Sequence, residues 1–291
     1  MKTFQLLVFL TLIFIASCSQ KTEMAATEEP QFATLTKVWE TDSVLLTPEA
    51  VIYDEFRDVL YVANIAGTPH DTLDYDGFIS IVSMDGEVIN RDWVSGGISS
   101  MKGMGIVDSS LFVTDMLEVV EIDIPSGEII KKYEAEEAGF LNDITVGPDN
   151  TVYISDSRTN SIHQIKDGEI SLFHQDSTFQ GSNGLLHMGD RLMVAGFGSG
   201  NLMALDPATK EYTVVADSIL QGDGINAYGD DFIVSCWRGV VFQSKPDGTT
   251  QMILDTQEEG KNAADAWYVA ETSMLYIPTF FGNTVAAYKV E

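Results

Sequence analysis

Basic residues are scarce in this chain. It contains 16 lysines and arginines against 44 aspartates and glutamates, which gives a formal net charge of −28 at pH 7. This excess of negative charge repels phosphate groups, so we expect neither nucleic acid nor a polyanionic substrate as a partner. The same charge favours the retention of divalent cations, although a solvated acidic surface that keeps the protein soluble would account for most of it.

Cysteine is nearly absent as well. The two cysteines are Cys18 and Cys236. Cys236 lies in a strand-like apolar run, where it is most simply a small buried residue. If Cys18 carries a lipid, no disulfide can form. The sequence also lacks a cysteine–histidine cluster for zinc and a nucleophile-elbow motif for a catalytic serine.

Long apolar runs are missing except near the N-terminus. Lys2 precedes the apolar run Leu6–Ile15, which is too short for a comfortable transmembrane helix and has the flanks of a secretion signal. Ile15-Ala16-Ser17-Cys18 fits the lipobox that precedes a lipidated cysteine. We therefore predict a lipoprotein signal peptide over residues 1–17 and lipidation of Cys18; an ordinary signal peptide with a chance cysteine is the alternative.

The residues after Cys18 define the predicted domain organisation. Residues 18–35 are polar and rich in small residues, so we predict a flexible tether between the lipid and a domain over 36–291. Ser19, rather than aspartate, follows the cysteine, which by the sorting rule for Gram-negative lipoproteins indicates the outer membrane. The chain is thus expected to be a bacterial cell-envelope lipoprotein that contacts the membrane through its lipid.

Amphipathic helical periodicity is also missing after the signal, and a repeat of short strands takes its place. Six triplets consist of a lead residue, a small or polar residue and an apolar residue, and each is followed by a strand-like run. After a longer first interval they recur about every 40 residues, the period of a β-propeller blade. We predict an all-β fold, a six-bladed β-propeller. The triplets are Glu49-Ala50-Val51, Met104-Gly105-Ile106, Asn142-Asp143-Ile144, Asn183-Gly184-Leu185, Asp223-Gly224-Ile225 and Asp265-Ala266-Trp267.

The lead residues are expected to converge on one axis, because equivalent positions in radially arranged blades form a ring. Most of them carry side-chain oxygens, the ligands that Ca²⁺ takes in proteins. A packed core gives no reason to place carboxylates there, and acidic and amide groups in a narrow channel are costly unless a cation or water satisfies them. The lead residues are Glu49, Met104, Asn142, Asn183, Asp223 and Asp265.

Four of these motifs, in order and in phase, resemble a known family over nearly the whole predicted domain. Pro48-Glu49, Asn142-Asp143, Asn183-Gly184 and Asp223-Gly224 are similar to the senescence-marker-protein/gluconolactonase/luciferin-regenerating-enzyme family of regucalcin-like six-bladed propellers. The resemblance implies that one divalent cation, most favourably Ca²⁺, is held by Glu49, Asn142, Asn183 and Asp223.

The chain also departs from that family. Members that bind sugar lactones often have an arginine two residues before the first asparagine, where Phe140 stands here, and Leu141 replaces the proline that often precedes the asparagine. The metal site therefore transfers better than the substrate, and gluconolactone itself is not expected.

The proposed ligands suit hydrolysis on chemical grounds. A bound divalent cation can polarise an ester or lactone carbonyl and lower the pKa of its water, and a neighbouring carboxylate can act as a general base. Asp223 is the family-matched catalytic base, and Asp265 is the reserve candidate. Taken singly, each asparagine or aspartate before a glycine is more simply a turn former.

Two functions from different classes follow. The first is a metal-dependent hydrolase that acts on a small lactone or ester in the central channel. The second is a non-catalytic propeller that binds a small ligand in the channel or a protein partner on its rim. The Phe140 departure favours the second, and the intact set of four oxygen ligands favours the first. The sequence identifies no protein partner.

Other candidate residues carry less weight. The histidines do not share a blade phase. Aromatic residues that follow inner-strand runs would line the channel mouth or pack between blades. The long acidic stretch 64–77 could cover the channel mouth or be a loose insertion. These histidines and aromatic residues are His70, His163, His174, His187, Trp237, Phe280 and Phe281.

Overall fold

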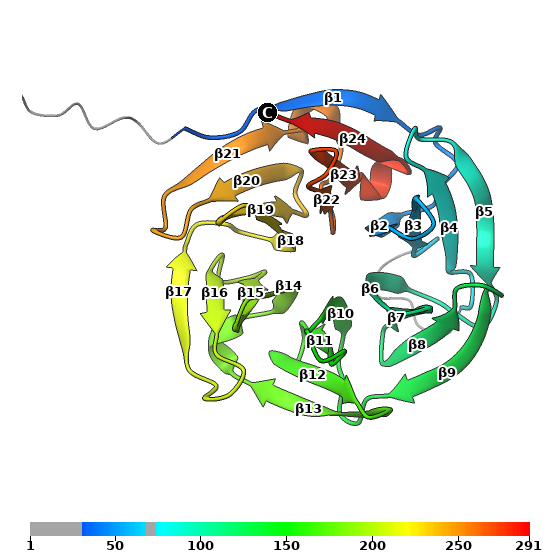
Figure 1. Cartoon of the computed structure of the whole chain (residues 1–291), viewed down its shortest axis with the longest axis horizontal. Helices are drawn as coiled ribbons and strands as arrows, with labels where there is room; N and C mark the ends of the chain where they lie inside the picture. The colour runs from blue at the N-terminus through cyan, green and yellow to red at the C-terminus, as the bar shows by residue number, and fades with distance from the viewer. Residues whose placement is uncertain (1–30, 68–73) are drawn as a thin grey trace, which may run out of the picture. The chain divides into compact units, whose positions relative to one another are not determined.

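Six four-stranded antiparallel sheets stand around one axis in the computed structural model, which describes residues 31–67 and 74–291 (Figure 1). The predicted all-β, six-bladed propeller is confirmed. The folded unit is Phe32–Glu291. The predicted signal peptide, Cys18 and residues 18–30 of the predicted tether lie outside the described residues, as do residues 68–73 of the long acidic stretch. Among the residues that are described, no helix has the length and apolarity needed to cross a membrane.

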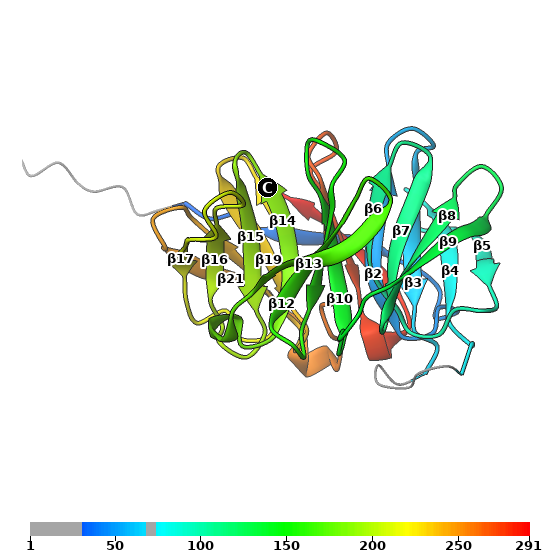
Figure 2. The same cartoon turned by 90° about the horizontal axis from the view of Figure 1, so that it is seen from below.

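In blades 1 to 3 the chain runs outward from the axis, so that the first strand of each blade is the innermost (Figures 1 and 2). Blade 1 contains β2 (Pro48–Asp54), β3 (Val59–Asn64), β4 (Phe78–Ser83) and β5 (Val88–Ser95). Blade 2 contains β6 (Met101–Val107), β7 (Ser110–Asp115), β8 (Glu118–Asp123) and β9 (Glu128–Glu134). Blade 3 contains β10 (Leu141–Val146), β11 (Val152–Asp156), β12 (Ser161–Lys166) and β13 (Glu169–Gln175).

Blades 4 and 5 repeat this order, and three short 3₁₀ helices, η1 to η3, lie in the connections of the second half. η1 (Ser177–Phe179) precedes blade 4, which contains β14 (Ser182–Met188), β15 (Arg191–Gly196), β16 (Leu202–Leu205) and β17 (Tyr212–Ala216). Blade 5 contains β18 (Gly222–Tyr228), β19 (Asp231–Cys236), β20 (Val240–Ser244) and β21 (Thr250–Asp255), followed by η2 (Gln257–Glu259). Blade 6 contains β22 (Trp267–Val269), β23 (Met274–Pro278), η3 (Phe280–Gly282) and β24 (Val285–Val290).

The ring is closed by the first strand of the folded unit. β1 (Leu35–Glu40) pairs antiparallel with β24 and forms the outer strand of blade 6. Thr34 and Glu291 exchange two backbone hydrogen bonds at 2.8 and 3.0 Å, so the first and last segments of the folded unit are joined in blade 6. The last residues of the predicted tether, 31–35, thus include the start of β1.

Apolar side chains fill each of the six interfaces between neighbouring blades. Between blades 1 and 2, for example, Ile52 and Ile79 pack with Leu111 and Val113 in one buried cluster. Equivalent clusters occupy the other five interfaces. The outermost strands bury little, as the largely exposed β9 shows. Burial therefore concentrates toward the axis and fixes the inner strands, which carry the candidate site.

A β-bulge re-aims the side chains at the start of each inner strand in blades 1 to 5. In blade 3, Leu141 pairs with Asp156 and Ile144 pairs with Ile154, so two residues face one partner. Bulges bend a strand and redirect a side chain. In blades 1, 3, 4 and 5 the redirected residues belong to the triplets found in the sequence, whereas in blade 2 they are Lys102 and Gly103. Glycines occupy tight turns between outer strands, where Gly86, Gly168 and Gly248 have φ values of 89°, 76° and 87°, a region of backbone conformation that favours glycine.

Candidate functional site

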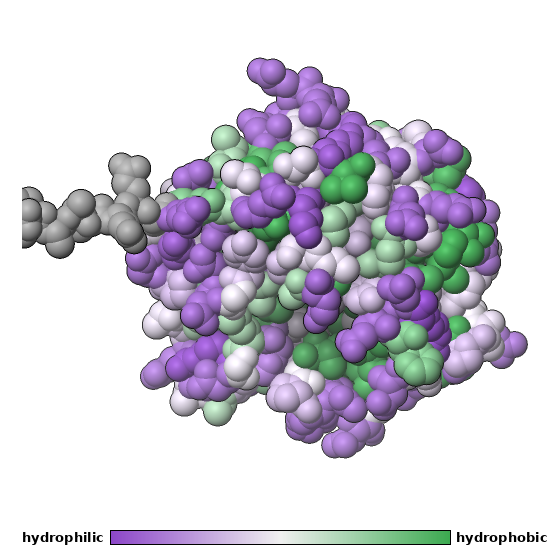
Figure 3. Space-filling model, turned by 45° about the horizontal axis from the view of Figure 1, so that its top comes forward, coloured by the Kyte–Doolittle hydropathy of each residue, from purple (hydrophilic) through white to green (hydrophobic). Residues whose placement is uncertain are grey.

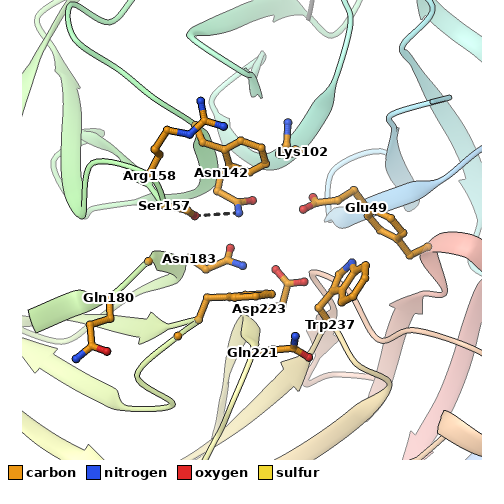
Figure 4. Close-up of a pocket in the computed structure, with 15 residues that line it drawn as sticks. Glu49, Lys102, Asn142, Ser157, Arg158, Gln180, Asn183, Gln221, Asp223 and Trp237 are labelled. Carbon is orange, nitrogen blue, oxygen red and sulfur yellow. Dashed lines mark hydrogen bonds between the residues drawn. The ribbon is translucent and has the colours of Figure 1, made fainter. Parts of the chain in front are cut away.

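A cavity of about 650 Å³ opens where the inner strands begin; we refer to it as the first cavity. Its innermost polar residues come from five consecutive blades, and all five are buried. Figure 4 shows their side chains gathered around the middle of the cavity. They are Glu49 of β2, Lys102 of β6, Asn142 of β10, Asn183 of β14 and Asp223 of β18.

The structure therefore brings together all four residues predicted as metal ligands. It also corrects the lead residue of blade 2. The pairs Met101↔Asp115 and Met104↔Val113 in blade 2 correspond to Leu141↔Asp156 and Ile144↔Ile154 in blade 3, so Lys102, not Met104, occupies the position of Asn142. Met104 matched the pattern of the triplets but lies two residues too late in the strand. Counting back about 40 residues from Asn142 would have found Lys102.

Asp265 does not line the first cavity either. It belongs with Asp143 to a second cavity of about 400 Å³, which is lined by later residues of the inner strands. Met104 and His187 line this second cavity as well. The six predicted lead residues thus do not form one ring: four lie in the first cavity, and Met104 and Asp265 lie in the second.

Two oxygens of the first cavity are buried without a hydrogen-bond partner. They are Glu49 Oε2 and Asn183 Oδ1. The amide of Asn142 is oriented by its neighbour, because its Nδ2 donates to Ser157 Oγ at 3.1 Å and that hydroxyl donates to the carbonyl of Ser182 at 2.8 Å (Figure 4). Buried acceptors without donors are costly, so these atoms point to a ligand that supplies positive charge or donors.

Burial dominates the electrostatics of the two carboxyl groups. It raises the pKa of Glu49 to about 8, with Lys102 opposing the shift and Asp143 adding to it. Burial, together with the charges of Glu49 and Asp143, also raises the pKa of Asp223 well above its usual value, although a hydrogen bond from Asn183 opposes this. Carboxyl groups in such surroundings hold a proton at neutral pH unless a cation balances their charge.

Lys102 is the residue of this ring that the sequence analysis missed. It is 1% exposed, and its Nζ donates to the carbonyl oxygen and the hydroxyl of Ser100 at 2.8 and 2.9 Å. Burial lowers its pKa to about 8, while Glu49 and Asp115 oppose the shift. The ring therefore contains one ammonium group beside two carboxyl groups.

Four aromatic residues contribute to the wall of the first cavity. Trp237 and Phe280, for which the sequence left the channel mouth and packing between blades open, line the first cavity, and their rings meet edge to face at 5.4 Å between centroids. Phe281 is exposed and packs against both rings. Phe140 and Phe197 complete the wall, and the polar rim carries Arg158, Gln180 and Gln221.

An arginine lies beside Phe140, the position at which the family pattern has an arginine. Arg158 follows β11 and lines the cavity with its guanidinium carbon 6.0 Å from the centroid of Phe140. Sequence reasoning missed it because no local motif marks an arginine on the loop after a second strand.

Histidine and cysteine play no part in the ring. Across residues 31–67 and 74–291, no group of three or more histidine, cysteine, aspartate or glutamate side chains is placed to hold a metal ion. The predicted ligand set has only two acidic residues, and its other two oxygens come from asparagine amides. His187 lines the second cavity and stacks on Tyr153.

Comparisons with known proteins support the fold. No protein-family model and no curated protein matches the chain. A catalytically inactive virginiamycin B lyase from Staphylococcus aureus with quinupristin has a TM-score of 0.63 at 14% identity, over 88% of this chain and 99% of that one. A protein described as a “putative gluconolactonase” has a TM-score of 0.62 at 15% identity, over 90% of this chain and 93% of that one.

One chain of a nidogen/laminin complex also matches, with a TM-score of 0.57 at 16% identity, over 68% of this chain and 75% of that one. At such identities these likenesses establish the architecture alone. They confirm the predicted resemblance to gluconolactonase-like six-bladed propellers at the level of the fold.

Proposed function

We propose that this chain is a divalent-metal-dependent hydrolase that acts on a small lactone or ester in the first cavity. The observation that carries the proposal is the meeting of four oxygen-bearing side chains from four blades, with Glu49 Oε2 and Asn183 Oδ1 buried and unpartnered. The fold likeness to a lyase and to a protein described as a gluconolactonase supports an enzyme in this architecture.

The residues present fit a hard cation. Glu49 and Asp223 offer two carboxylates, and Asn142 and Asn183 offer two neutral carbonyl oxygens. Ca²⁺ accepts such a mixture and completes its six to eight ligands with water or substrate. Lys102 cannot replace the cation, because one ammonium group balances one of the two carboxylates and leaves the other buried without a counter-charge.

The chemistry divides between the cation and the protein. When bound, a divalent cation polarises a carbonyl and lowers the pKa of water. Asp223 supplies the general base that takes the proton of the attacking water. The aromatic wall of Phe197, Trp237 and Phe280 holds the apolar part of the substrate. Asp265, the reserve base, lines the second cavity and is not used.

Metal analysis of the purified protein is the first test, followed by a panel of lactones and aryl esters with and without a chelator. We expect one Ca²⁺ per chain and hydrolysis that the chelator abolishes and added Ca²⁺ restores. Activity that survives complete metal removal would overturn the metal dependence. Reactions in ¹⁸O-labelled water separate hydrolysis from elimination, because only hydrolysis places the label in the acid product.

A non-catalytic binding propeller is the second candidate. The observation that favours it is the fold shared with a chain of the nidogen/laminin complex. If the metal-loaded protein turns over nothing in a lactone, ester and phosphotriester panel, this becomes the better function for the same cavity.

We also propose a cell-envelope lipoprotein, which rests on the sequence of residues 1–18. Mass spectrometry of the membrane-extracted protein should show a chain that begins at Cys18 and carries acyl groups. A Cys18→Ala variant should lose its membrane attachment. Tight membrane binding of that variant would contradict the lipid anchor.

A further inference from the structure

Arg158 is an arginine without an anionic partner in a strongly acidic chain. Arg57, Arg91 and Arg191 each pair with an aspartate. Among the described residues, Arg158 has no carboxylate at ion-pair distance and no side-chain hydrogen bond. Its guanidinium carbon lies 6.0 Å from the centroid of the Phe140 ring. Its guanidinium donors are therefore available to a ligand in the first cavity, which Arg158 lines.

Asp156 holds Phe140 and Arg158 side by side. Its fully buried carboxylate accepts hydrogen bonds from the backbone of Gly139 at 2.7 Å and of Phe140 at 3.0 Å. The same carboxylate accepts from the backbone of Arg158 at 3.0 Å and of Thr159 at 3.1 Å. One side chain thus joins the loop before β10 to the loop after β11, so the arginine and the aromatic ring are arranged before any ligand arrives.

The absence of a side chain at Gly139 leaves room for the side chain of Arg158. A Cβ atom at position 139 would lie 2.8 Å from Cβ and 3.0 Å from Cδ of Arg158. The aliphatic stem of Arg158 therefore lies against the backbone of the neighbouring loop, which fixes the direction of the guanidinium and reduces the conformational freedom that binding would otherwise remove.

Lys102 adds charge to the same region without adding a free donor. Its Nζ lies 4.6 Å from the centroid of Phe140, and its hydrogens already go to Ser100 and toward the sulfur of Met116. The first cavity thus has two cationic side chains on one aromatic ring, in a chain with 16 basic and 44 acidic residues.

We infer that the substrate carries an anionic group, most simply a carboxylate, and that Arg158 binds this group at the rim of the first cavity. The inference depends on the proposed hydrolase for one point only, which is the identity of the reacting group. That group is an ester or a lactone that faces the four oxygen ligands. Arginine suits this role because its planar fork donates two parallel hydrogen bonds to a carboxylate. The substrate class is a small anionic ester or lactone with an apolar body.

A matched pair of probes tests the inference without any turnover. Phenylacetate and phenylacetamide share one shape and differ in charge, so calorimetry in the presence of Ca²⁺ measures the preference for an anion. We expect wild type to bind phenylacetate about tenfold more tightly than the amide. Arg158→Gln should bring the two affinities together. Arg191→Gln, which removes an equal charge from the exposed Asp206 pair, should retain the wild-type preference.

Gly139→Ala is a second variant that keeps every charge. Its added Cβ would lie 2.8 Å from Cβ of Arg158, so Arg158 or the loop before β10 must shift. This variant should reduce the preference for phenylacetate while the folded state persists by circular dichroism. Equal affinities of wild type for both probes, no binding of either at millimolar concentration, or an unchanged preference in Arg158→Gln would each overturn the inference. Anion preference without hydrolysis of any ester would refute the hydrolase and leave the anion site standing.

Discussion

The two cavities along the propeller axis are both lined by acidic residues, but these residues differ in their hydrogen-bond partners. Asp143 and Asp265 line the second cavity, as Glu49 and Asp223 line the first. In the first cavity Glu49 Oε2 and Asn183 Oδ1 have no partner. In the second, Asp143 accepts from the backbone of Ile144 and Leu185, both at 2.6 Å.

The hydrogen bonds of the second cavity join neighbouring blades. Asp143 of blade 3 accepts from Leu185 of blade 4. Asn226 of blade 5 donates to the carbonyl of Ala266 and accepts from Tyr268, both at 2.8 Å, in blade 6. Asp143 and Asn226 are therefore satisfied within the protein, and their hydrogen bonds connect neighbouring blades.

Residue type alone does not show whether a buried carboxyl group in a propeller channel has a structural role or binds a ligand. Where backbone donors satisfy it, it is part of the fold; where it is left without donors, it is available to a ligand. The surface around these cavities gives little help, since the face in Figure 3 is mostly hydrophilic with scattered apolar patches, as expected for a net charge of −28.

The largest expected effect is a loss of catalytic turnover, which should distinguish the first cavity from the second. Asp223→Asn keeps an oxygen ligand and the volume but removes the base, so we expect turnover to fall by about 10²–10⁴-fold. Asp265→Asn is the matched control from the second cavity and should change turnover far less. Steady-state kinetics on a substrate found in the panel measures both. Full activity of Asp223→Asn would remove it from the mechanism, and equal losses in both variants would break the distinction between the cavities.

Asp143 should matter for stability rather than for metal. Asp143→Ala leaves the backbone N–H groups of Ile144 and Leu185 buried without acceptors, so we expect a loss of about 2–4 kcal/mol in the free energy of unfolding. Asp143→Asn keeps one acceptor oxygen and should lie between the two. Denaturant unfolding, with metal content measured on the folded fraction, provides the readout. A stable Asp143→Ala protein that has lost its metal would reverse the assignment of the two ends.

Glu49→Gln should weaken metal binding and leave the stability of the metal-free protein nearly unchanged, the reverse of what we expect for Asp143→Ala. The change is nearly isosteric and removes one carboxylate from the ligand set, so calcium affinity should fall by at least roughly tenfold. Unfolding without metal should change little, because Glu49 Oε2 has no partner to lose. Since a ligand stabilises in proportion to the logarithm of its excess over the dissociation constant, the calcium-dependent rise in Tm should shrink. The same metal content and Tm shift as wild type would exclude Glu49 as a ligand.

The regular repeat made the fold and most of the ring predictable from sequence. In blades 1, 3, 4 and 5 a triplet lies at the start of the inner strand, and its recurrence placed Glu49, Asn142, Asn183 and Asp223 together. The long stretch in blade 1 blurred this phase, and Met104, which satisfies the pattern by chance, was chosen over Lys102. The triplet pattern also takes no account of the extra residue that a β-bulge adds to a strand.

The rest of the site could not be predicted because it depends on contacts between loops. Phe140 stands where the family pattern has an arginine, and Arg158 lies beside Phe140 from the loop after β11. The pairing of the two residues is set by Asp156, whose four backbone hydrogen bonds reach both loops. Neither the spacing of Phe140 and Arg158 in the sequence nor the composition around them shows that the two residues lie side by side. Asp265 was likewise assigned to the ring by its phase, and its position farther along the channel is visible only in three dimensions.

Glu40 at the closure of the ring provides the smallest effect and a reference for both cavities. It accepts hydrogen bonds from Thr284 at 2.6 Å and from Lys261 at 2.7 Å. Burial raises its pKa, but the hydrogen bonds of Lys261, Lys37 and Thr284 outweigh burial and lower the pKa to about 2. A carboxyl group whose folded pKa lies below its unfolded value of about 4.5 stabilises the fold above that unfolded value and loses this contribution as the pH falls toward 2.

Glu40→Gln should therefore lower the free energy of unfolding by less than about 1 kcal/mol at pH 7, because the group is partly exposed and solvent screens its ion pairs. The difference from wild type should shrink steadily from pH 5 to pH 2.5 in thermal unfolding at constant ionic strength. Glu49→Gln, whose parent carboxyl has no such partner, should show no loss of this kind in the absence of metal. A difference between wild type and Glu40→Gln that grows as the pH falls would show that Glu40 is not held ionised by its partners, and would contradict the rule that hydrogen-bond donors decide the role of a carboxyl group.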